Sequence, residues 1–282
     1  MRARAPASSA NLGPGFDTLA VGLGLYVEVE VEETEHLSVT SSGEGSDLAL
    51  DASHLAARIA AEVVGHDRLS VHVRSDIPVG RGLGSSAAVA AAAAAAAGAA
   101  DPLAVAAATD GHPENAAASV LGGLVTATMV GGRPVATRLP LDPALVFVVL
   151  VPDRPLPTAE ARSALPAEVP HADAAFNLGR MGLLLAGLAD RHRLVPEAAE
   201  DRLHQGARGV LFPEAVQLMA GLLEAGALAA CWSGAGPSLL AICETVGAGR
   251  LRTDGERLLR LAGVEGRSLL LAADMGGLTI EA

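Results

Sequence analysis

The segment PVGRGLGSSAA, from Pro78 to Ala88, and the alanine run that continues it restrict the fold of this chain more than any other feature. Glycines at positions 80, 82 and 84 allow backbone torsions that side chains forbid, so several N–H groups can converge on one point. The alanines have high helix propensity, and a helix that begins near Ser85 directs the positive end of its dipole at that point. The segment therefore predicts an anion site, and phosphate is the anion that we expect.

This glycine loop differs from the common P-loop. That motif has a lysine after its last glycine, whereas this chain has Ser85 there. All 20 basic residues are arginines, so no lysine can clamp a phosphate or form a Schiff base. The alternative interpretation is a tight connection between two elements that binds nothing. The rest of the chain has to decide between the two.

Composition narrows the class of partner. The 282 residues are 50% hydrophobic and 18% charged, which suits one large or two modest packed domains. A net charge of −12 with scattered acidic residues disfavours binding to nucleic acid or to an anionic membrane, and 2% aromatic residues leave no stacking ladder for single strands. The first residues lack the apolar core of a signal peptide, and the alanine run is too short and too weakly hydrophobic to span a membrane. We expect a cytoplasmic protein with a small-molecule partner, in which Cys231 and Cys243 are buried thiols.

The first half of the chain predicts a strand, a loop and a helix around the glycine motif. Alternation with period two over Leu25–Val31 predicts a strand, with His36–Thr40 as its hairpin partner. A helix over Asp51–Val64 with Asp51 as its cap and a strand over Leu69–Val73 precede the glycine loop. This is the context that an anion site requires. The elements expected after the alanine helix are helices from Asp101 and from Gly111 and a hairpin of Gly123–Met129 with Pro134–Leu139.

A second domain is predicted to begin near residue 140. There the composition changes, and the apolar run Leu145–Val151 predicts a buried strand that ends at Pro152. The further elements expected are helices over 158–165, 170–190, 196–204, 213–225 and 247–262 and strands over 227–232, 237–242 and 267–272. This mixture predicts α+β layers in both halves, with a site between them.

Five ordered motifs resemble a known family. The glycine loop is similar to the central motif of the GHMP kinases, and PASSANLGPGFDTLAVGL at 6–23 to the N-terminal signature of the homoserine kinase family among them. GHPENAAASVLGG at 111–123 resembles that family's GHPDNVAPALLGG, TAEAR at 158–162 its TKEAR, and SGAGPSLLAI at 233–242 the third GHMP motif. The matches keep the family's order from residue 6 to about residue 242.

The resemblance implies a fold and an activity. The fold would be the α+β, two-domain GHMP kinase fold, with an N-terminal α/β ATP-binding domain of mixed sheet and helices over 1–142 and a C-terminal ferredoxin-like α+β domain over 143–282. The activity would be transfer of the γ-phosphoryl group of ATP, with Mg²⁺, to the side-chain hydroxyl of L-homoserine, giving O-phospho-L-homoserine for threonine biosynthesis. The alternatives are a GHMP kinase for another small alcohol, a non-catalytic relative that binds a metabolite, and a plain interaction protein. A homodimer is a further expectation from the resemblance.

The resemblance also assigns the nucleotide site. The residues expected to bind ATP are Pro78, Gly80, Arg81, Gly82, Leu83, Gly84, Ser85 and Ser86. The Ser86 hydroxyl would contact Mg²⁺ together with Asp110, for which a turn or capping role is the alternative. For Arg81, contact with phosphate and exposure to solvent both stay open.

The acceptor is a zwitterion, so its site requires a cation for the carboxylate and an anion for the ammonium group. By resemblance, Arg162 and Arg208 bind the carboxylate, Asp17 binds the ammonium group, and two asparagines orient the hydroxyl. The residues predicted to bind the acceptor are Asn11, Asp17, Asn115, Thr158, Arg162, Arg208 and Gly234, of which Asn11, Asp17, Asn115 and Arg162 are the predicted catalytic residues. Thr158 has a helix N-cap role as its alternative.

The mechanism expected from these residues uses no dedicated base. An amide at position 115 cannot accept a proton at neutral pH, which favours catalysis by alignment and charge stabilisation. His112 is expected to brace a loop. The departures from the family pattern are Glu114 for Asp, Ala159 for Lys, and Gln205 and Gly206 for Glu and Pro.

Overall fold

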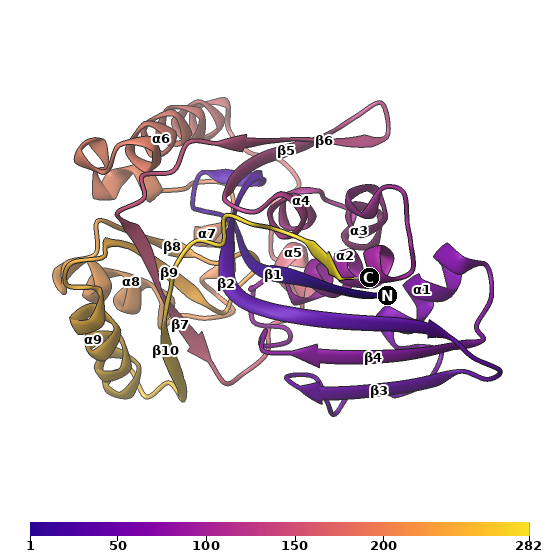
Figure 1. The fold of residues 1–282 in the computed structure, drawn as a ribbon. Helices are drawn as coiled ribbons and strands as arrows, with labels where there is room; N and C mark the ends of the chain where they lie inside the picture. The colour runs from indigo at the N-terminus through magenta and orange to yellow at the C-terminus, as the bar shows by residue number, and fades with distance from the viewer. Residues whose placement is uncertain (282) are drawn as a thin grey trace.

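The computed structural model describes residues 1–281 as two sheets flanked by helices (Figure 1). The larger sheet has seven strands: β1 (Arg2–Asn11), β2 (Gly15–Glu33), β3 (Ser38–Gly43), β4 (Leu69–Ser75), β5 (Leu124–Val130), β6 (Arg133–Leu139) and β11 (Thr279–Glu281). The smaller sheet is antiparallel in the order β10, β7, β9, β8, with bounds β7 (Leu145–Pro152), β8 (Ala229–Trp232), β9 (Leu239–Glu244) and β10 (Gly266–Leu271). The α+β class expected from the sequence is confirmed.

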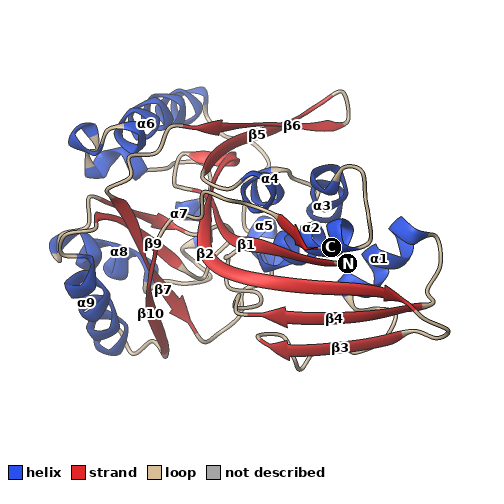
Figure 2. Cartoon of the chain, viewed as in Figure 1, coloured by secondary structure: helices blue, strands red, loops and turns tan. Residues whose placement is uncertain are grey.

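The helices divide between the two sheets (Figure 2). Those packed around the larger sheet are α1 (Leu55–Val64), α2 (Ser85–Ala96), α3 (Pro102–Asp110) and α4 (Glu114–Leu121). Those that cover the smaller sheet are α8 (Ala215–Glu224) and α9 (Ala248–Leu261). The connecting elements are α5 (Thr158–Ser163), α6 (His171–Ala189), α7 (Gln205–Arg208) and the 3₁₀ turns η1 (Arg191–Arg193) and η2 (Pro196–Ala199). None of the helices within residues 1–281 is long and apolar enough to cross a membrane.

Helix α2 lies at the centre of the larger unit. It contacts β1, β2, α1, α3 and α4, and every residue from Ala87 to Ala96 except Val89 is buried. A helix that is packed on all sides has no polar face, and alanine is small enough for the neighbouring backbones to approach it. The alanine run thus forms the helix predicted from it and serves as a compact core for the site at its N-terminus.

The strand β2 is long enough to join three neighbours. Residues 27–33 pair with β4, residues 19–21 pair with β5, and β1 runs along the strand with register shifts at Pro6/Ala7 and Ala10/Asn11. Around the turn between β1 and β2, Asn11 at the end of β1, Leu12 in the turn and Asp17 near the start of β2 have positive φ angles. Non-glycine residues rarely adopt this conformation, and such strain is common at functional sites.

Two predicted details at the start of the chain are wrong. Residues 38–43 form no hairpin with β2; β3 pairs in parallel with β4, which occupies the edge of β2. Period-two alternation identifies a strand but carries no information about its partner. Helix α1 begins at Leu55 with His54 as its cap, and Asp51 instead accepts hydrogen bonds from Ser53.

Two further differences lie in the second half. The helix predicted over 196–204 is replaced by η2 and α7, because the Asp201 side chain accepts the N–H groups of residues 203, 204 and 205 and breaks the helix between them. Strand β11 was not predicted; it pairs with β1 and places the two ends of the chain side by side (Figure 1). The boundary at residue 142 stays a prediction, to which the structure adds that the last strand returns to the first sheet.

The smaller sheet has its own core, formed with α8 and α9 around Trp232 and Phe212. The two cysteines are free and buried, as expected. Burial raises the pKa of Cys231 to about 12 and that of Cys243 to about 11. Neither thiol is available as a nucleophile at neutral pH.

Candidate active site

A cavity of about 750 Å³ lies between the glycine loop, the turn after β1, helix α5 and the turn after β8. Its volume is in the range of sites for small ligands. The residues predicted for the site that line this cavity are Asn11, Asp17, Pro78, Gly80, Arg81, Gly82, Leu83, Gly84, Ser85, Ser86, Asp110, Asn115, Thr158, Arg162, Arg208 and Gly234. The structure therefore brings all of the predicted residues together.

The glycine loop is held by its carbonyl groups. Three of them accept hydrogen bonds from outside the loop: Gly80 from the Leu156 N–H at 3.0 Å, Gly82 from the Ser233 hydroxyl at 2.7 Å, and Leu83 from the Ser8 N–H at 3.1 Å. Within residues 1–281, the N–H groups of residues 80–86 donate no hydrogen bond, and α2 begins without a side-chain cap. The loop thus presents unpaired amides and a helix N-terminus together, which is an arrangement that binds phosphate.

The glycines of this loop are required by its geometry. Gly80, Gly82 and Gly84 have φ angles of +66°, +72° and +65°. A Cβ atom at position 82 would overlap the Ser233 carbonyl oxygen, and one at position 84 would overlap Ser8 Oγ. The loop could not pack against β1 and the turn after β8 with side chains at these positions.

Arg81 links the glycine loop to the end of β7. Its Nε donates to the Pro152 carbonyl at 2.8 Å, and its terminal nitrogens donate to the carbonyls of Val79 and Asp153. The guanidinium is therefore engaged with the end of β7. The sequence had left open whether the Arg81 side chain contacts phosphate or solvent, and hydrogen bonding to backbone carbonyls was not among these alternatives.

Ser86 and Asp110 lie next to each other at the start of α2. The Ser86 hydroxyl donates to Asp110 Oδ1 at 2.8 Å. Burial raises the pKa of Asp110, although the Ser86 hydrogen bond opposes the shift. Asp110 is also the last residue of α3, where the negative end of the helix dipole disfavours a carboxylate, and its side chain caps no N–H group within residues 1–281. Both effects destabilise the anion until a cation approaches, and two oxygen donors suit Mg²⁺.

Asp17 and Arg162 form an ion pair at the other side of the loop. The two guanidinium nitrogens of Arg162 donate to the two carboxylate oxygens at 2.7 and 3.1 Å. The hydrogen bonds to Asp17 raise the pKa of Arg162. These are the groups predicted to bind the ammonium and the carboxylate of a zwitterion. In this structure each serves as the counterion of the other. A zwitterion could replace this ion pair with two, one between its ammonium group and Asp17 and one between its carboxylate and Arg162.

Arg208 is a buried cation without a carboxylate partner. Its side chain is 1% exposed and donates to the Gly234 carbonyl at 3.0 Å, with His204 Nδ1 at 2.9 Å. Burial, followed by the nearby charge of Arg162, lowers its pKa to about 10. No carboxylate of residues 1–281 lies within 4.0 Å of this guanidinium. Such a charge is costly to bury, and an anionic group of a ligand would relieve the cost.

The two arginines face the same place. The guanidinium carbons of Arg162 and Arg208 lie 5.7 and 5.5 Å from the centre of the Phe16 ring. Phe16 precedes Asp17 at the start of β2, and its ring stacks on that of His204 with 5.2 Å between the ring centres. The strained turn therefore supplies the surface that both arginines share.

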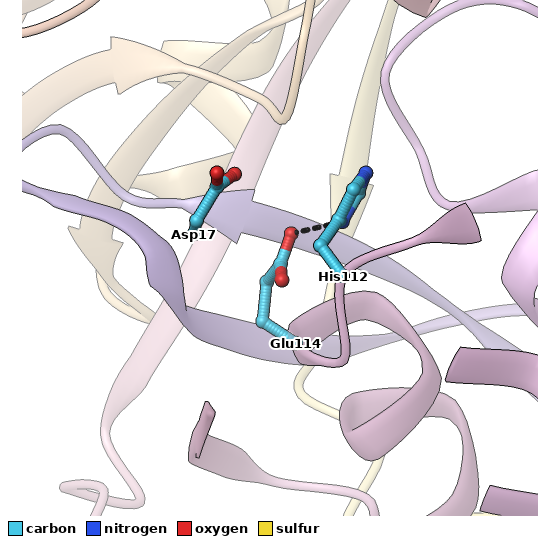
Figure 3. Close-up of side chains that lie close together, drawn as sticks. All are labelled: Asp17, His112 and Glu114. Carbon is cyan, nitrogen blue, oxygen red and sulfur yellow. Dashed lines mark ion pairs between the residues drawn. The ribbon is translucent and has the colours of Figure 1, made fainter. Parts of the chain in front are cut away.

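His112 and Glu114 form a second ion pair beside Asp17 (Figure 3). His112 Nδ1 lies 2.7 Å from Glu114 Oε1, and Glu114 is 1% exposed. The second carboxylate oxygen, Oε2, is buried without a hydrogen-bond partner within residues 1–281. Ligand atoms of the three residues lie within 4.8 Å of one another, but Arg162 and His112 already pair with the two carboxylates, which makes this cluster a charge network instead of a metal site. Sequence analysis did not place Glu114 in the site, although its replacement of the family's Asp next to Asn115 was a signal.

The His112–Glu114 pair predicts a pH dependence of stability. Burial lowers the pKa of His112, but the pairing with Glu114 outweighs this effect and raises it above 6.5. A histidine whose pKa is higher in the folded than in the unfolded protein stabilises the fold. This stabilisation is fully present below the unfolded-state pKa and is lost as pH rises through the folded-state pKa. Glu114→Gln is therefore expected to lower the melting temperature more at about pH 5.5 than at about pH 8.5. Thermal melts of both proteins check this, and an equal difference at the two pH values would contradict it.

The two predicted asparagines have different surroundings. Asn11 uses both ends of its amide within the protein, since Nδ2 donates to the Gly234 carbonyl at 2.8 Å and Oδ1 accepts from the Asp17 N–H at 3.0 Å. Asn115 accepts from the Ser8 hydroxyl at 2.9 Å, and its Nδ2 donates no hydrogen bond within residues 1–281. Asn115 is therefore the one with a donor to offer a ligand, whereas Asn11 braces the turn. The predicted contact of Asn11 with the substrate hydroxyl is not favoured by this geometry.

Thr158 and Gly234 lie at the wall contributed by the second half of the chain. Pro157, and not Thr158, is the N-cap of α5, so the capping alternative for Thr158 is wrong. The remaining end of the cavity was not predicted. Its lining includes the apolar side chains of Leu48, Leu55, Val73, Val79 and Val89 together with His54. These residues come from separate elements and share no motif.

Comparisons with known proteins agree with this geometry. The model of the GHMP kinases N terminal domain matches residues 49–123, and that of the GHMP kinases C terminal domain matches residues 174–254. With the two sheets and the loop described above, these matches define a kinase of the GHMP class.

Individual relatives narrow the class. A homoserine kinase of Streptomyces avermitilis is 40% identical over 99% of this chain and 95% of that protein. Another from Thermus thermophilus is 40% identical over 96% of this chain and 95% of that protein. The crystal structure of homoserine kinase from Cytophaga hutchinsonii superposes with a TM-score of 0.85 at 25% identity, covering 100% of this chain and 97% of that one. The chain belongs to the homoserine kinase family.

Proposed function

We propose that this protein transfers the γ-phosphoryl group of ATP to the side-chain hydroxyl of L-homoserine and releases ADP and O-phospho-L-homoserine, a precursor of threonine. The relatives at about 40% identity over nearly the whole chain support this activity. The observation that carries the choice of acceptor is the buried, unpaired Arg208 beside the Asp17–Arg162 pair. An amino acid brings one anion and one cation to these groups, whereas a neutral alcohol would leave Arg208 without a counterion.

The acceptor is expected to lie with its carboxylate between the two arginines. Its ammonium group then has two carboxylates nearby, those of Asp17 and Glu114. The hydroxyl lies toward Asn115, whose Nδ2 can orient it. Binding both ends of the substrate fixes the third group, and such positioning supplies much of the rate enhancement of a phosphoryl transfer.

The transfer itself needs charge stabilisation more than proton abstraction. The hydroxyl oxygen attacks the γ-phosphorus, the bond to the leaving ADP oxygen breaks, and the hydroxyl proton passes to the transferred phosphate or to water. The free amides of residues 80–86 face the charge of the phosphates. His112 is a poor base here, because Glu114 favours its protonated form. Alignment without a dedicated base is the mechanism that this site supports.

Ser86 and Asp110 are the residues that would hold Mg²⁺. Their oxygens are adjacent, and the placement of Asp110 at the end of a helix favours a cation. When bound there, the ion neutralises negative charge on the phosphates. The chain's own contribution is to hold a carboxylate and a hydroxyl at the N-terminus of α2.

A change at Asp110 tests this assignment. Asp110→Asn is expected to raise the Mg²⁺ concentration needed for half-maximal activity about tenfold, because a charged ligand is lost. Turnover measured against Mg²⁺ at saturating ATP checks it, with Asp101→Asn, which changes a carboxylate that caps the same helix, as the control. An unchanged Mg²⁺ requirement would assign Asp110 a structural role.

The proposed activity is tested with a panel of acceptors. Purified protein is incubated with Mg·ATP and homoserine, mevalonate, galactose or threonine, and ADP release is measured. Activity confined to homoserine is expected. Activity with another alcohol would make this chain a GHMP kinase for a different acceptor, and no nucleotide binding at all would indicate a non-catalytic relative. We further propose that the protein is cytoplasmic and forms a homodimer. Analytical ultracentrifugation tests the oligomeric state.

A further inference from the structure

The end of the cavity away from Asp17 and Arg162 has the properties of a site for a flat ring. Leu48 and Val79 line it and are 48% and 37% exposed, which is high for large apolar side chains. Val79 immediately precedes the glycine loop, and Gly45 lies against both Val79 and Leu48. If ATP places its phosphates on the loop, as the proposed function requires, this end is the part of the cavity left for its base.

One polar side chain of this wall, His54, has its protonation state fixed by the fold. Its Nδ1 accepts the Ala56 N–H at 3.3 Å as the cap of α1, so Nδ1 carries no proton. The proton of the neutral ring is therefore on Nε2. Burial lowers the pKa of His54, although the charge of Asp51 opposes the shift, and the ring stays neutral at physiological pH.

His54 has a hydrogen-bond donor without a partner. The residue is 7% exposed and lines the cavity, and no hydrogen bond from Nε2 is formed within residues 1–281. A ligand that fills this end of the cavity takes water away from the donor, so a ligand group that accepts a hydrogen bond here gains affinity, and one that donates is rejected. N1 of adenine is an acceptor, whereas N1 of guanine carries a proton; N3 and N7 are acceptors in both bases.

We propose that His54 donates a hydrogen bond from Nε2 to N1 of adenine and thereby selects ATP over GTP. The side chain of His54 then has two roles, because the hydrogen bond by which it caps α1 also fixes the tautomer that donates to the base. This inference rests on the proposed ATP-dependent function.

Two nearly isosteric variants separate these tasks. Asparagine and aspartate both cap helices well, but only asparagine has a donor. His54→Asn and His54→Asp are therefore expected to have similar melting temperatures. His54→Asp is expected to bind ATP about tenfold more weakly than His54→Asn, measured by calorimetry without homoserine. The wild-type protein is expected to prefer ATP to GTP by about tenfold or more.

Inorganic tripolyphosphate controls for the added charge of aspartate. If the loss in His54→Asp comes from the base, both variants bind tripolyphosphate equally. Equal affinity of the two variants for ATP, an equal loss with tripolyphosphate, or equal wild-type affinities for ATP and GTP would each overturn the inference. A wild-type protein that binds neither ATP nor tripolyphosphate would instead overturn the proposed function, and this inference with it.

Discussion

Replacing Arg208 with glutamine is expected to raise KM for homoserine about 100-fold or more and to leave the ligand-free protein as stable as before, or more stable. The first effect is the loss of a charged contact to the substrate carboxylate, for which about 3 kcal/mol is typical. The second follows from burial: a pKa lowered to about 10, well below the ordinary value of arginine, means that the folded state holds this cation at a cost, on the order of 3 kcal/mol. Glutamine can keep the hydrogen bond to the Gly234 carbonyl without the charge.

Steady-state kinetics and thermal melts of the same preparations test both parts. Arg202→Gln is the matched control, because Arg202 lies in the same segment but is exposed and pairs with Asp173. The control is expected to keep the KM for homoserine. A large fall in melting temperature of Arg208→Gln with little change in KM would show that the arginine holds the fold and not the substrate. Arg208→Lys is expected to fail as well, since a point charge cannot reproduce the bonds to His204 and Gly234.

The second large effect is expected at Gly84. Gly84→Ala should reduce ATP binding and turnover about 100-fold, because its φ of +65° strains an alanine and the added Cβ overlaps Ser8 Oγ, which displaces the loop amides. Gly263 provides the control, with a φ of +68° and no heavy atom within 4 Å of an added Cβ. Gly263→Ala should cost only the conformational strain, about 1 kcal/mol of stability, and keep ATP affinity.

Nucleotide binding by calorimetry and kcat at saturating homoserine distinguish the two substitutions. Gly84→Ala with normal ATP affinity would mean that the amides of the loop do not face the phosphates. An equal loss in both variants would point to general destabilisation. The Ser8 hydroxyl also contacts Asn115, so a shift at Gly84 is expected to disturb the acceptor as well.

The sequence predicted the elements around the site better than their pairing. The helix of Ser85–Ala96 follows from local propensity, and the motifs that resemble the GHMP kinases all lie on one cavity. The parallel pairing of β3 with β4 could not be predicted, because a strand pattern does not name its neighbour. Strand β11 is three residues long and is formed by its contact with β1, which no local signal encodes.

The site shows the same limit. The resemblance to the family identified Asp17, Arg162 and Arg208, but not that the first two pair across 145 positions of sequence or that the third is buried without a counterion. Arg81 was assigned to the nucleotide because it lies in the loop, whereas its bonds lead to the end of β7. The base end of the cavity has no motif, since its apolar side chains are drawn from β4, α1, α2 and two connections. Such contacts arise only when the elements have packed.

The three donors that hold the carbonyls of the glycine loop come from Ser8, Leu156 and Ser233, which are spread over most of the chain. A truncated protein that stops at residue 142 would contain the complete loop and the whole of α2 but only the first of these donors. A chain can therefore contain the glycine-loop motif without being able to bind a nucleotide, because binding depends on the complete tertiary structure. Any partial opening that carries the smaller sheet away from the larger one should release ATP before the rest of the molecule unfolds.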